Sequence, residues 1–198
     1  LRIRELSEKK NIPVLAFIED VAASGGYWLA CAADEIFASK ASIVGSIGVV
    51  SSGFGFDKAI EKLGVQRRLY TSGDNKAILD PFLPENKEDI KRLKAIQKEL
   101  HSQFIAFVKS RRGSKIKDDN KEVFTGAFWS GESGIEIGLI DSFGEMRKVL
   151  KERFGNKIKI KEFMPKKKLF GFSSLLGGAM EMLIFKIEER SILKRFGL

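Results

Sequence analysis

The chain has very few of the residues that cross-link small proteins or bind metals in them. Its 198 residues include one cysteine, Cys31, and one histidine, His101. A single cysteine excludes an intramolecular disulfide, and one residue of each kind argues against a His/Cys structural zinc site. No uncharged apolar run reaches the roughly 20 residues that a membrane-spanning helix needs. We therefore expect about one globular domain without a His/Cys zinc site.

Charge limits the partners that the chain can have. Lysine and arginine number 35 against 26 acidic residues, a formal net charge of +9. Such an excess favours anionic partners, of which nucleic acid and an anionic membrane surface are the usual candidates. No RNA-recognition, helix-turn-helix or zinc-finger pattern accompanies the charge. The sequence therefore predicts possible contact with a membrane surface and no nucleic-acid binding.

One serine lies at a junction between a predicted strand and a predicted helix. Val14–Ile18 is an apolar run after a proline, typical of a buried strand, and good helix formers follow Gly26. Small residues surround Ser24 between them, so a substrate could come close. The amide of Gly25 would lie at the positive end of the helix, where an oxyanion is stabilised. This setting suits a nucleophile, and it equally suits a serine that merely caps the helix.

A resemblance favours the nucleophile. Ala22–Trp28, followed by Ala32–Ile36, resembles the nucleophile segment of the signal peptide peptidase A family of Ser–Lys peptidases. Three later stretches are similar to that family in the same order, so the likeness covers roughly residues 1 to 150. These stretches are Gly45–Val49, Ser72–Lys76 and Gly138–Gly144.

The resemblance implies a fold and a set of roles. The fold would be α/β and ClpP/crotonase-like, a layered sheet with flanking helices. Ser24 would be the nucleophile, Lys76 the general base, Ser46 the residue that orients the lysine, and the Gly25 amide an oxyanion donor. A lysine can accept a proton only when it is neutral, and burial among apolar residues favours the neutral form by lowering the pKa.

Two domains are predicted. Residues 1–164 would form the peptidase core and 165–198 a basic and apolar helical extension at the C-terminus. Leu1–Lys10 reads as the end of an amphipathic helix, so we expect an N-terminal part to be missing. By resemblance, that part would carry an upstream Gly-rich turn with a second oxyanion donor, and a membrane anchor.

Periodicity predicts several other elements. The longest helix should span Pro84–Arg112, with His101 as a partly exposed packing residue at the edge of its apolar stripe. Alternating or β-branched residues predict strands at Ile43–Val50, Val65–Tyr70 and Lys157–Lys161.

The resemblance implies a serine peptidase that needs no cofactor and no metal, and that cleaves hydrophobic peptides, such as remnant signal peptides, at a membrane of a bacterial cell. Because the sequence holds one copy of each motif, the resemblance implies a homo-oligomer in which Ser24 and Lys76 meet between protomers. Two alternatives remain open. One is a crotonase-type enzyme that binds an acyl-CoA thioester, and the other is a non-catalytic oligomeric scaffold.

Overall fold

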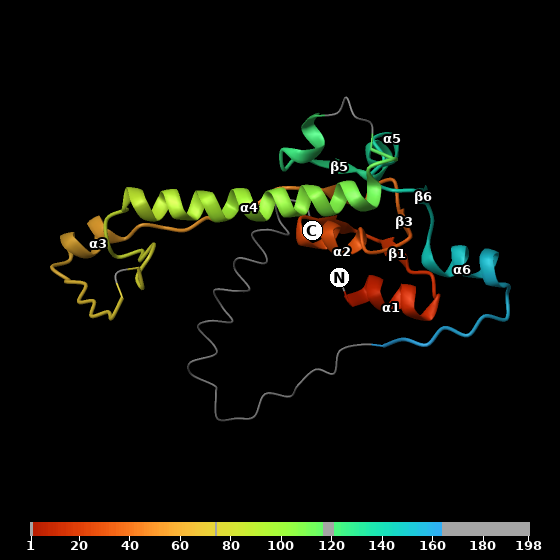
Figure 1. Ribbon diagram of the computed structural model, residues 1–198, viewed down its shortest axis with the longest axis horizontal. Coiled ribbons are helices and arrows are strands. Elements are labelled where there is room, and N and C mark those ends of the chain that lie inside the picture. The colour runs from red at the N-terminus through yellow and green to blue at the C-terminus, as the bar shows by residue number, and fades with distance from the viewer. Residues whose placement is uncertain (1, 74, 117–120, 164–198) are drawn as a thin grey trace. The chain divides into compact units, whose positions relative to one another are not determined.

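A computed structural model describes residues 2–73, 75–116 and 121–163 (Figure 1). The chain divides into two compact units, Leu1–Met146 and Arg147–Leu198. In the second unit, the described part consists of most of α6 (Met146–Phe154) and the stretch after it. The predicted extension at 165–198 lies outside the described residues, so the boundary at 164 stays a prediction.

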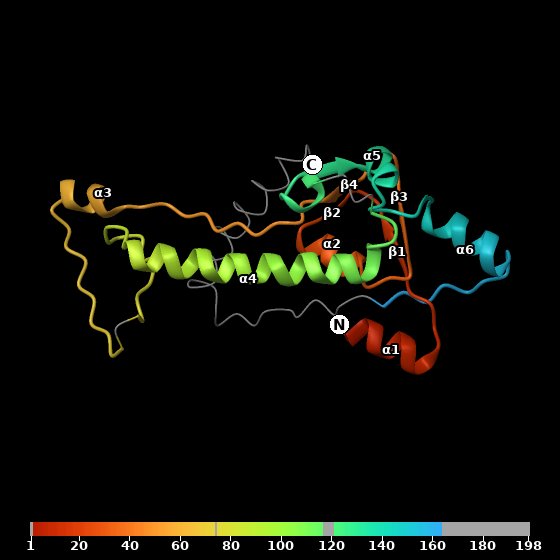
Figure 2. The same ribbon diagram turned by 45° about the horizontal axis from the view of Figure 1, so that its top comes forward.

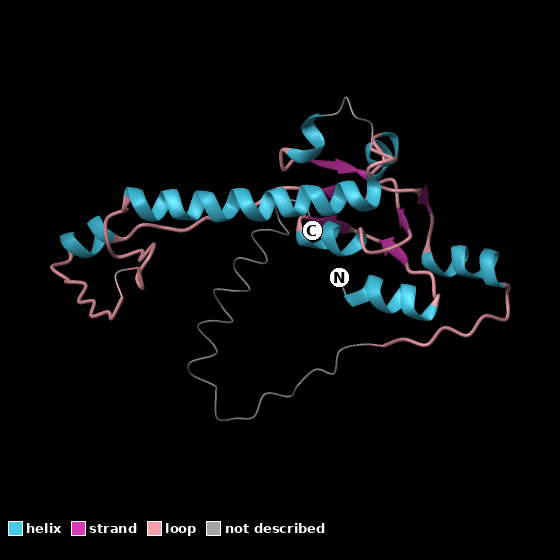
Figure 3. Ribbon diagram, in the orientation of Figure 1, coloured by secondary structure: helices cyan, strands magenta, loops and turns pink. Residues whose placement is uncertain are grey.

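The first unit holds all the strands that the structure describes (Figure 3). Its helices are α1 (Arg2–Lys10), α2 (Gly25–Ala30), α3 (Asp57–Lys62), α4 (Lys87–Arg112) and α5 (Gly131–Glu136), with a 3-10 turn at Lys121–Phe124. Its strands are β1 (Leu15–Ile18), β2 (Val21–Ala23), β3 (Glu35–Ala38), β4 (Ile43–Gly45), β5 (Phe128–Ser130) and β6 (Ser142–Phe143).

The strands form two small sheets. In the first sheet, β1, β3 and β6 are parallel in that order, with Ala16 opposite Ile36. In the second, β2 pairs in parallel with β4, and β4 pairs antiparallel with β5. Parallel strands need crossover connections, and α2 supplies the one between β1 and β3. The predicted α/β class is therefore confirmed.

The core lies where α2 and the C-terminal half of α4 meet the sheets. Tyr27 is fully buried and its hydroxyl donates to the Leu139 carbonyl at 2.8 Å. The Trp28 ring stacks on Phe104 with ring centroids 4.5 Å apart. Apolar burial of this kind stabilises a fold by roughly 25 cal/mol per Å². The largest fully buried apolar side chains are Tyr27, Phe104, Ile36, Ile47, Leu139, Val44, Val108 and Val123.

The segment between β4 and α4 leaves this core. Residues 49–86, which we call the arm, contain α3 and extend beside the N-terminal half of α4 (Figures 1 and 2). No described residue of the arm is buried, and several large apolar side chains are exposed, with Phe54 81% and Tyr70 89% accessible. The arm is held together by its own contacts, among them a tilted ring pair, Phe56 and Phe82, and an Arg67–Asp80 ion pair.

Three strand predictions need correction. Val65–Tyr70 and Lys157–Lys161 are not strands, and the strand expected at Ile43–Val50 ends at Gly45. In the first two, β-branched and alternating residues have no neighbouring strand to pair with among the described residues. Side-chain pattern alone does not form a strand, because its stability comes from a paired neighbour. The helix expected at Pro84–Arg112 is confirmed from Lys87 onward, with Asn86 as its N-cap.

A buried ion pair fixes the C-terminal end of α4. The Arg112 guanidinium, 3% exposed, donates to the Asp141 carboxylate at 2.6 Å, and Lys115 also binds Asp141. The same carboxylate accepts the Ile36 amide at 2.8 Å, which joins helix and sheet. Burial alone would raise the pKa of Asp141, but the hydrogen bonds from Arg112 and Lys115 hold that pKa below its usual value.

We expect Asp141→Asn to destabilise the protein by about 3 kcal/mol in urea unfolding at neutral pH, because Arg112 would keep its hydrogen bonds to the Gly138 carbonyl but lose the negative charge that balances its buried guanidinium. Since the folded-state pKa is lowered, the contribution of Asp141 is present above its unfolded pKa of about 3.9. That contribution is lost as the pH falls through the folded value, and the two stability curves should converge there. Glu61→Gln on exposed α3 is the control, with an expected change under about 0.5 kcal/mol. An equal effect of the two substitutions would contradict the role of the pair.

Candidate active site

Ser24 occupies a strained turn between β2 and α2. Its φ of 53° and ψ of −120° belong to a region that glycine adopts easily and that costs other residues about 1–3 kcal/mol. Its amide donates to the Gly45 carbonyl at 2.9 Å, and its carbonyl accepts from Trp28 at 3.0 Å. The backbone is therefore held from both sides, while the side chain lies exposed.

The Ser24 hydroxyl does not cap the helix that follows it. Ser24 is the N-cap residue of α2, yet its side chain makes no capping hydrogen bond. Asn86 and Ser130 show the contrast, since their side chains accept from Glu88 and Ser133 at the starts of α4 and α5. The capping alternative is therefore wrong, although the predicted position at the strand–helix junction is confirmed.

Open space lies next to the serine. A Cβ built on Gly25 would meet nothing within 4 Å, so a ligand can approach this backbone. The Gly25 amide opens the helix and has no i−4 carbonyl to bond. An outward-facing N–H beside an exposed hydroxyl is the pair of groups that acyl transfer requires.

The turn after β4 brings Ser46 beside Ser24. The last register pair of β2 and β4 joins Ala23 to Gly45, so Ser24 and Ser46 each follow that pair by one residue. Ser46 also has a positive φ, 52°, and its amide donates to the Ala127 carbonyl at 2.7 Å. Its half-buried hydroxyl makes no hydrogen bond to the described residues.

Gly45 explains why this turn needs glycine. It has a φ of 98°, and an added Cβ would lie 2.8 Å from the Trp129 ring. Both the conformation and the space exclude a side chain.

Lys76 lies in the arm, and its side chain is exposed. Its neighbours Ala77 and Leu79 line a cavity together with Asn86 and Asp89, at the first turn of α4. Ser24 leads into α2, which contacts α4 at Phe104 and beyond. Fifteen helical residues separate positions 89 and 104, roughly 22 Å along the axis. Within one chain, the structure brings Ser24 and Ser46 together and leaves Lys76 apart from both.

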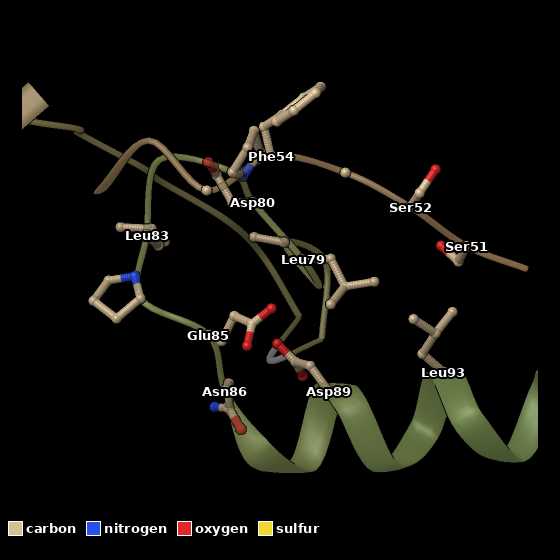
Figure 4. Close-up of a pocket in the computed structure, with 15 residues that line it drawn as sticks. Ser51, Ser52, Phe54, Leu79, Asp80, Leu83, Glu85, Asn86, Asp89 and Leu93 are labelled. Carbon is tan, nitrogen blue, oxygen red and sulfur yellow. The ribbon is translucent and has the colours of Figure 1, made fainter. Parts of the chain in front are cut away.

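The arm cavity itself, about 480 Å³ in volume, contains none of the predicted site residues. Glu85, Asn86 and Asp89 lie at the α4 end, and Ser51 and Ser52 come from the loop across from it (Figure 4). Leu79 and Leu93 give it an apolar part. The cavity is thus formed where the two ends of the arm meet.

An apolar groove lies on the other side of the serine turn. It has a volume of about 490 Å³ and begins at Gly26, two residues after Ser24. Its walls come from β1, β2, α1 and α2. The apolar residues that line it are Ile3, Val14, Ala16, Phe17, Ile18, Val21, Ala22, Leu29, Ala30, Ala32 and Ala33. Glu19 and Asp20 also line the groove. Its mainly apolar walls accept apolar side chains.

Cys31 is not a rival nucleophile. It is fully buried, and burial raises the pKa of its thiol to about 11. The thiol is therefore protonated at neutral pH and closed to substrate. In the part of the chain that the structure covers, no group of three His, Cys, Asp or Glu side chains is placed to ligate a metal ion. No helix within that part is both long and apolar enough to cross a membrane.

The sequence did not indicate the contact of His101. The prediction of a partly exposed residue is confirmed, but its ring Nε2 also lies 3.0 Å from the Ile47 carbonyl oxygen. The available signal was its spacing, because His101 lies one helical turn before Phe104 on α4. A polar ring at the edge of an apolar stripe has to find a partner when it is half-buried.

The chain was compared with known protein families and curated proteins. A profile of peptidase family S49 matches residues 7–157. The chain is 35% identical over 139 residues to a protein named as signal peptide peptidase SppA from Enterococcus faecium, covering 69% of this chain and 40% of that protein. It is 39% identical over 140 residues to a protein named as the protease SohB from Buchnera aphidicola, covering 71% of this chain and 44% of that protein.

A further relative carries a different name. The chain is 46% identical over 211 aligned residues to a protein of Brucella abortus named Na⁺/H⁺ antiporter NhaA, covering 100% of this chain and 28% of that protein. The chain thus spans about half or less of each of these three relatives.

Solved structures are similar to the chain at a low level. A mutant of a membrane-bound stomatin-specific protease aligns with a TM-score of 0.40 and 17% identity, over 76% of this chain and 59% of that one. An enoyl-CoA hydratase/isomerase family protein from Hyphomonas neptunium aligns with a TM-score of 0.36 and 21% identity, over 76% and 39%. Similarity at this level carries no argument about function.

Proposed function

Because the chain belongs to peptidase family S49, we propose that it is a serine peptidase in which Ser24 is the nucleophile and Lys76 the general base. The observation that carries this proposal is the Ser24 turn. A strained backbone holds an exposed hydroxyl that makes no capping hydrogen bond. Strain without a structural benefit is typical of a functional position, and nucleophilic serines lie on such sharp strand-to-helix turns.

In the proposed reaction, neutral Lys76 takes the Ser24 proton while the serine oxygen attacks the carbonyl carbon of a peptide bond. The Gly25 amide donates to the oxyanion of the tetrahedral intermediate. Collapse releases the amine, protonated by the lysine, and leaves an acyl ester on Ser24. Water then adds to the ester by the same route and frees the acid. Ser46 accepts or donates a hydrogen bond at the lysine and orients it.

We propose that Lys76 comes from a second copy of the chain. The separation along α4 and the exposure of the arm support this arrangement, because one chain keeps the lysine apart from its own serine. The apolar side chains on the arm are suited to cover a neighbour, and burial there would supply the neutral lysine that the mechanism needs. Head-to-tail contacts of this kind close into rings.

We propose hydrophobic peptides, such as remnant signal peptides, as substrates. The apolar groove beside Ser24 and the SppA name of one relative support this class. A net charge of +9 suits work at an anionic membrane surface in a bacterial cell, with the anchor supplied by a segment outside the given sequence.

A covalent probe tests the proposal. A fluorophosphonate should label the protein once per chain, and mass spectrometry of the digest should place the adduct on Ser24. Labelling in an assembly is the expected result, and prior incubation with an apolar peptide aldehyde should block it. An acyl-CoA enzyme or a scaffold would not react, so an unlabelled, folded assembly would overturn the assignment.

A further inference from the structure

His101 on α4 makes a hydrogen bond whose direction is fixed by chemistry. Its Nε2 lies 3.0 Å from the carbonyl oxygen of Ile47. A carbonyl oxygen only accepts, so Nε2 must carry the proton and donate. A ring nitrogen that already donates cannot take a proton from a serine. His101 is therefore unsuited to act as the general base through Nε2.

The acceptor lies within the turn that adjoins the nucleophile. Ile47 belongs to the Gly45–Gly48 turn, in which the Gly48 amide donates to the Ser46 carbonyl at 2.9 Å. The Gly45 carbonyl of this same turn accepts the Ser24 amide. The Gly45 carbonyl of the turn thus supports the strained serine, and the Ile47 carbonyl of the same turn is held by His101.

The same contact closes the base of the arm. The arm leaves the turn directly after Gly48 and returns to the core through α4, so His101 and Ile47 are 54 residues apart in sequence. One turn along α4, Phe104 is buried and stacks on Trp28 of α2. His101 therefore lies on the half of α4 that packs against the core. It hydrogen-bonds to the turn from which the arm extends.

We propose that His101 is a positioning residue for the peptidase reaction. It holds the Gly45–Gly48 turn, and through it the Ser46 hydroxyl and the Ser24 backbone, in the geometry for attack, and it sets the direction in which the arm leaves. The proposal rests on the proposed function, since it assumes that Ser24 is the nucleophile.

Loss of this donor has a defined consequence. The Ile47 carbonyl would lose its partner in a region where the Ile47 side chain is fully buried, and the turn would shift to find another donor. A displacement of about 1 Å at a catalytic group costs roughly 100-fold in rate. Substrate binding in the apolar groove, which no residue of α4 lines, should change little.

Two variants and a control test the proposal in the assembled protein with an apolar peptide substrate. His101→Leu removes the donor at similar volume, and His101→Gln keeps an N–H. We expect His101→Leu to lower kcat by roughly 10- to 100-fold with KM within about threefold, and to slow fluorophosphonate labelling in parallel. His101→Gln should recover most of both rates. Gln103→Leu, on the exposed side of the same helix, should match wild type. Equal kcat for His101→Leu and Gln103→Leu, or equal losses for the leucine and glutamine variants, would overturn the proposal.

A measurement on the unmutated protein does not depend on how the variants fold. Because His101 is the only histidine in the sequence, labelling histidine with ¹⁵N gives one pair of ring-nitrogen signals. Nε2 should appear protonated, with a slowly exchanging proton, and an unprotonated Nε2 would refute the donor role. Failure of the proposed function would look different, because hydrolysis would then survive in Ser24→Ala whatever happens at His101.

Discussion

Ser24→Ala should abolish peptide hydrolysis and leave the fold intact. Removing the nucleophile of a serine peptidase lowers kcat by about 10⁴-fold or more. The Ser24 hydroxyl makes no capping hydrogen bond, so its loss should change the free energy of unfolding by less than about 0.5 kcal/mol. Turnover per mole of purified protein and urea unfolding measure the two effects. Hydrolysis at the wild-type rate by the alanine variant would remove Ser24 from the mechanism.

Ser24→Gly is the matched control for strain. Glycine accepts a φ of 53° without cost, so this variant should be equally inactive and about 1 kcal/mol more stable than Ser24→Ala. A gain in stability with a loss of activity is what a strained functional residue gives. If the glycine variant were the less stable of the two, the argument from strain would be wrong.

Local patterns predicted the parts of the fold that local forces determine. The 3.6-residue periodicity of α4 predicted that helix to within three residues at its start, and the apolar run at Val14–Ile18 predicted β1. The strand predictions for Val65–Tyr70 and Lys157–Lys161 are wrong. A strand depends on hydrogen bonds to a neighbouring strand, and its own residues do not show whether that neighbour is present. The type of element could be predicted where the backbone hydrogen bonds lie within one segment, as they do in a helix.

The candidate site likewise has features that the local sequence predicted and features that it did not. Small residues around Ser24 predicted space for a substrate, and a Cβ built on Gly25 would meet nothing within 4 Å. The positive φ of Ser24 and the bond from His101 to Ile47 could not be predicted, because both follow from contacts between distant segments. The roles of Ser24, Lys76, Ser46 and Gly25 stay predictions.

Mixed assemblies should reveal whether Ser24 and Lys76 act from different chains. The Ser24→Ala and Lys76→Ala proteins should each be inactive alone, as should Lys76→Arg, since arginine stays protonated and cannot act as a base. When the two alanine variants are co-assembled in equal amounts, a site has one chance in two of an intact serine and one in two of an intact lysine from its neighbour. About a quarter of the sites should therefore be whole if the pair forms between chains.

A second mixture gives activity under either arrangement and so controls for damaged assembly. An equal mixture of wild type and the Ser24→Ala, Lys76→Ala double variant should show, per total protein, about a quarter of the all-wild-type activity if the pair forms between chains, and about half if it forms within one. Native mass spectrometry verifies that mixed assemblies are present. Replacement of Lys62 on α3, an exposed lysine of the same arm, should leave turnover unchanged. No recovery in the first mixture, with half the activity retained in the second, would show that each chain completes its own site and that the arm must fold back toward Ser24.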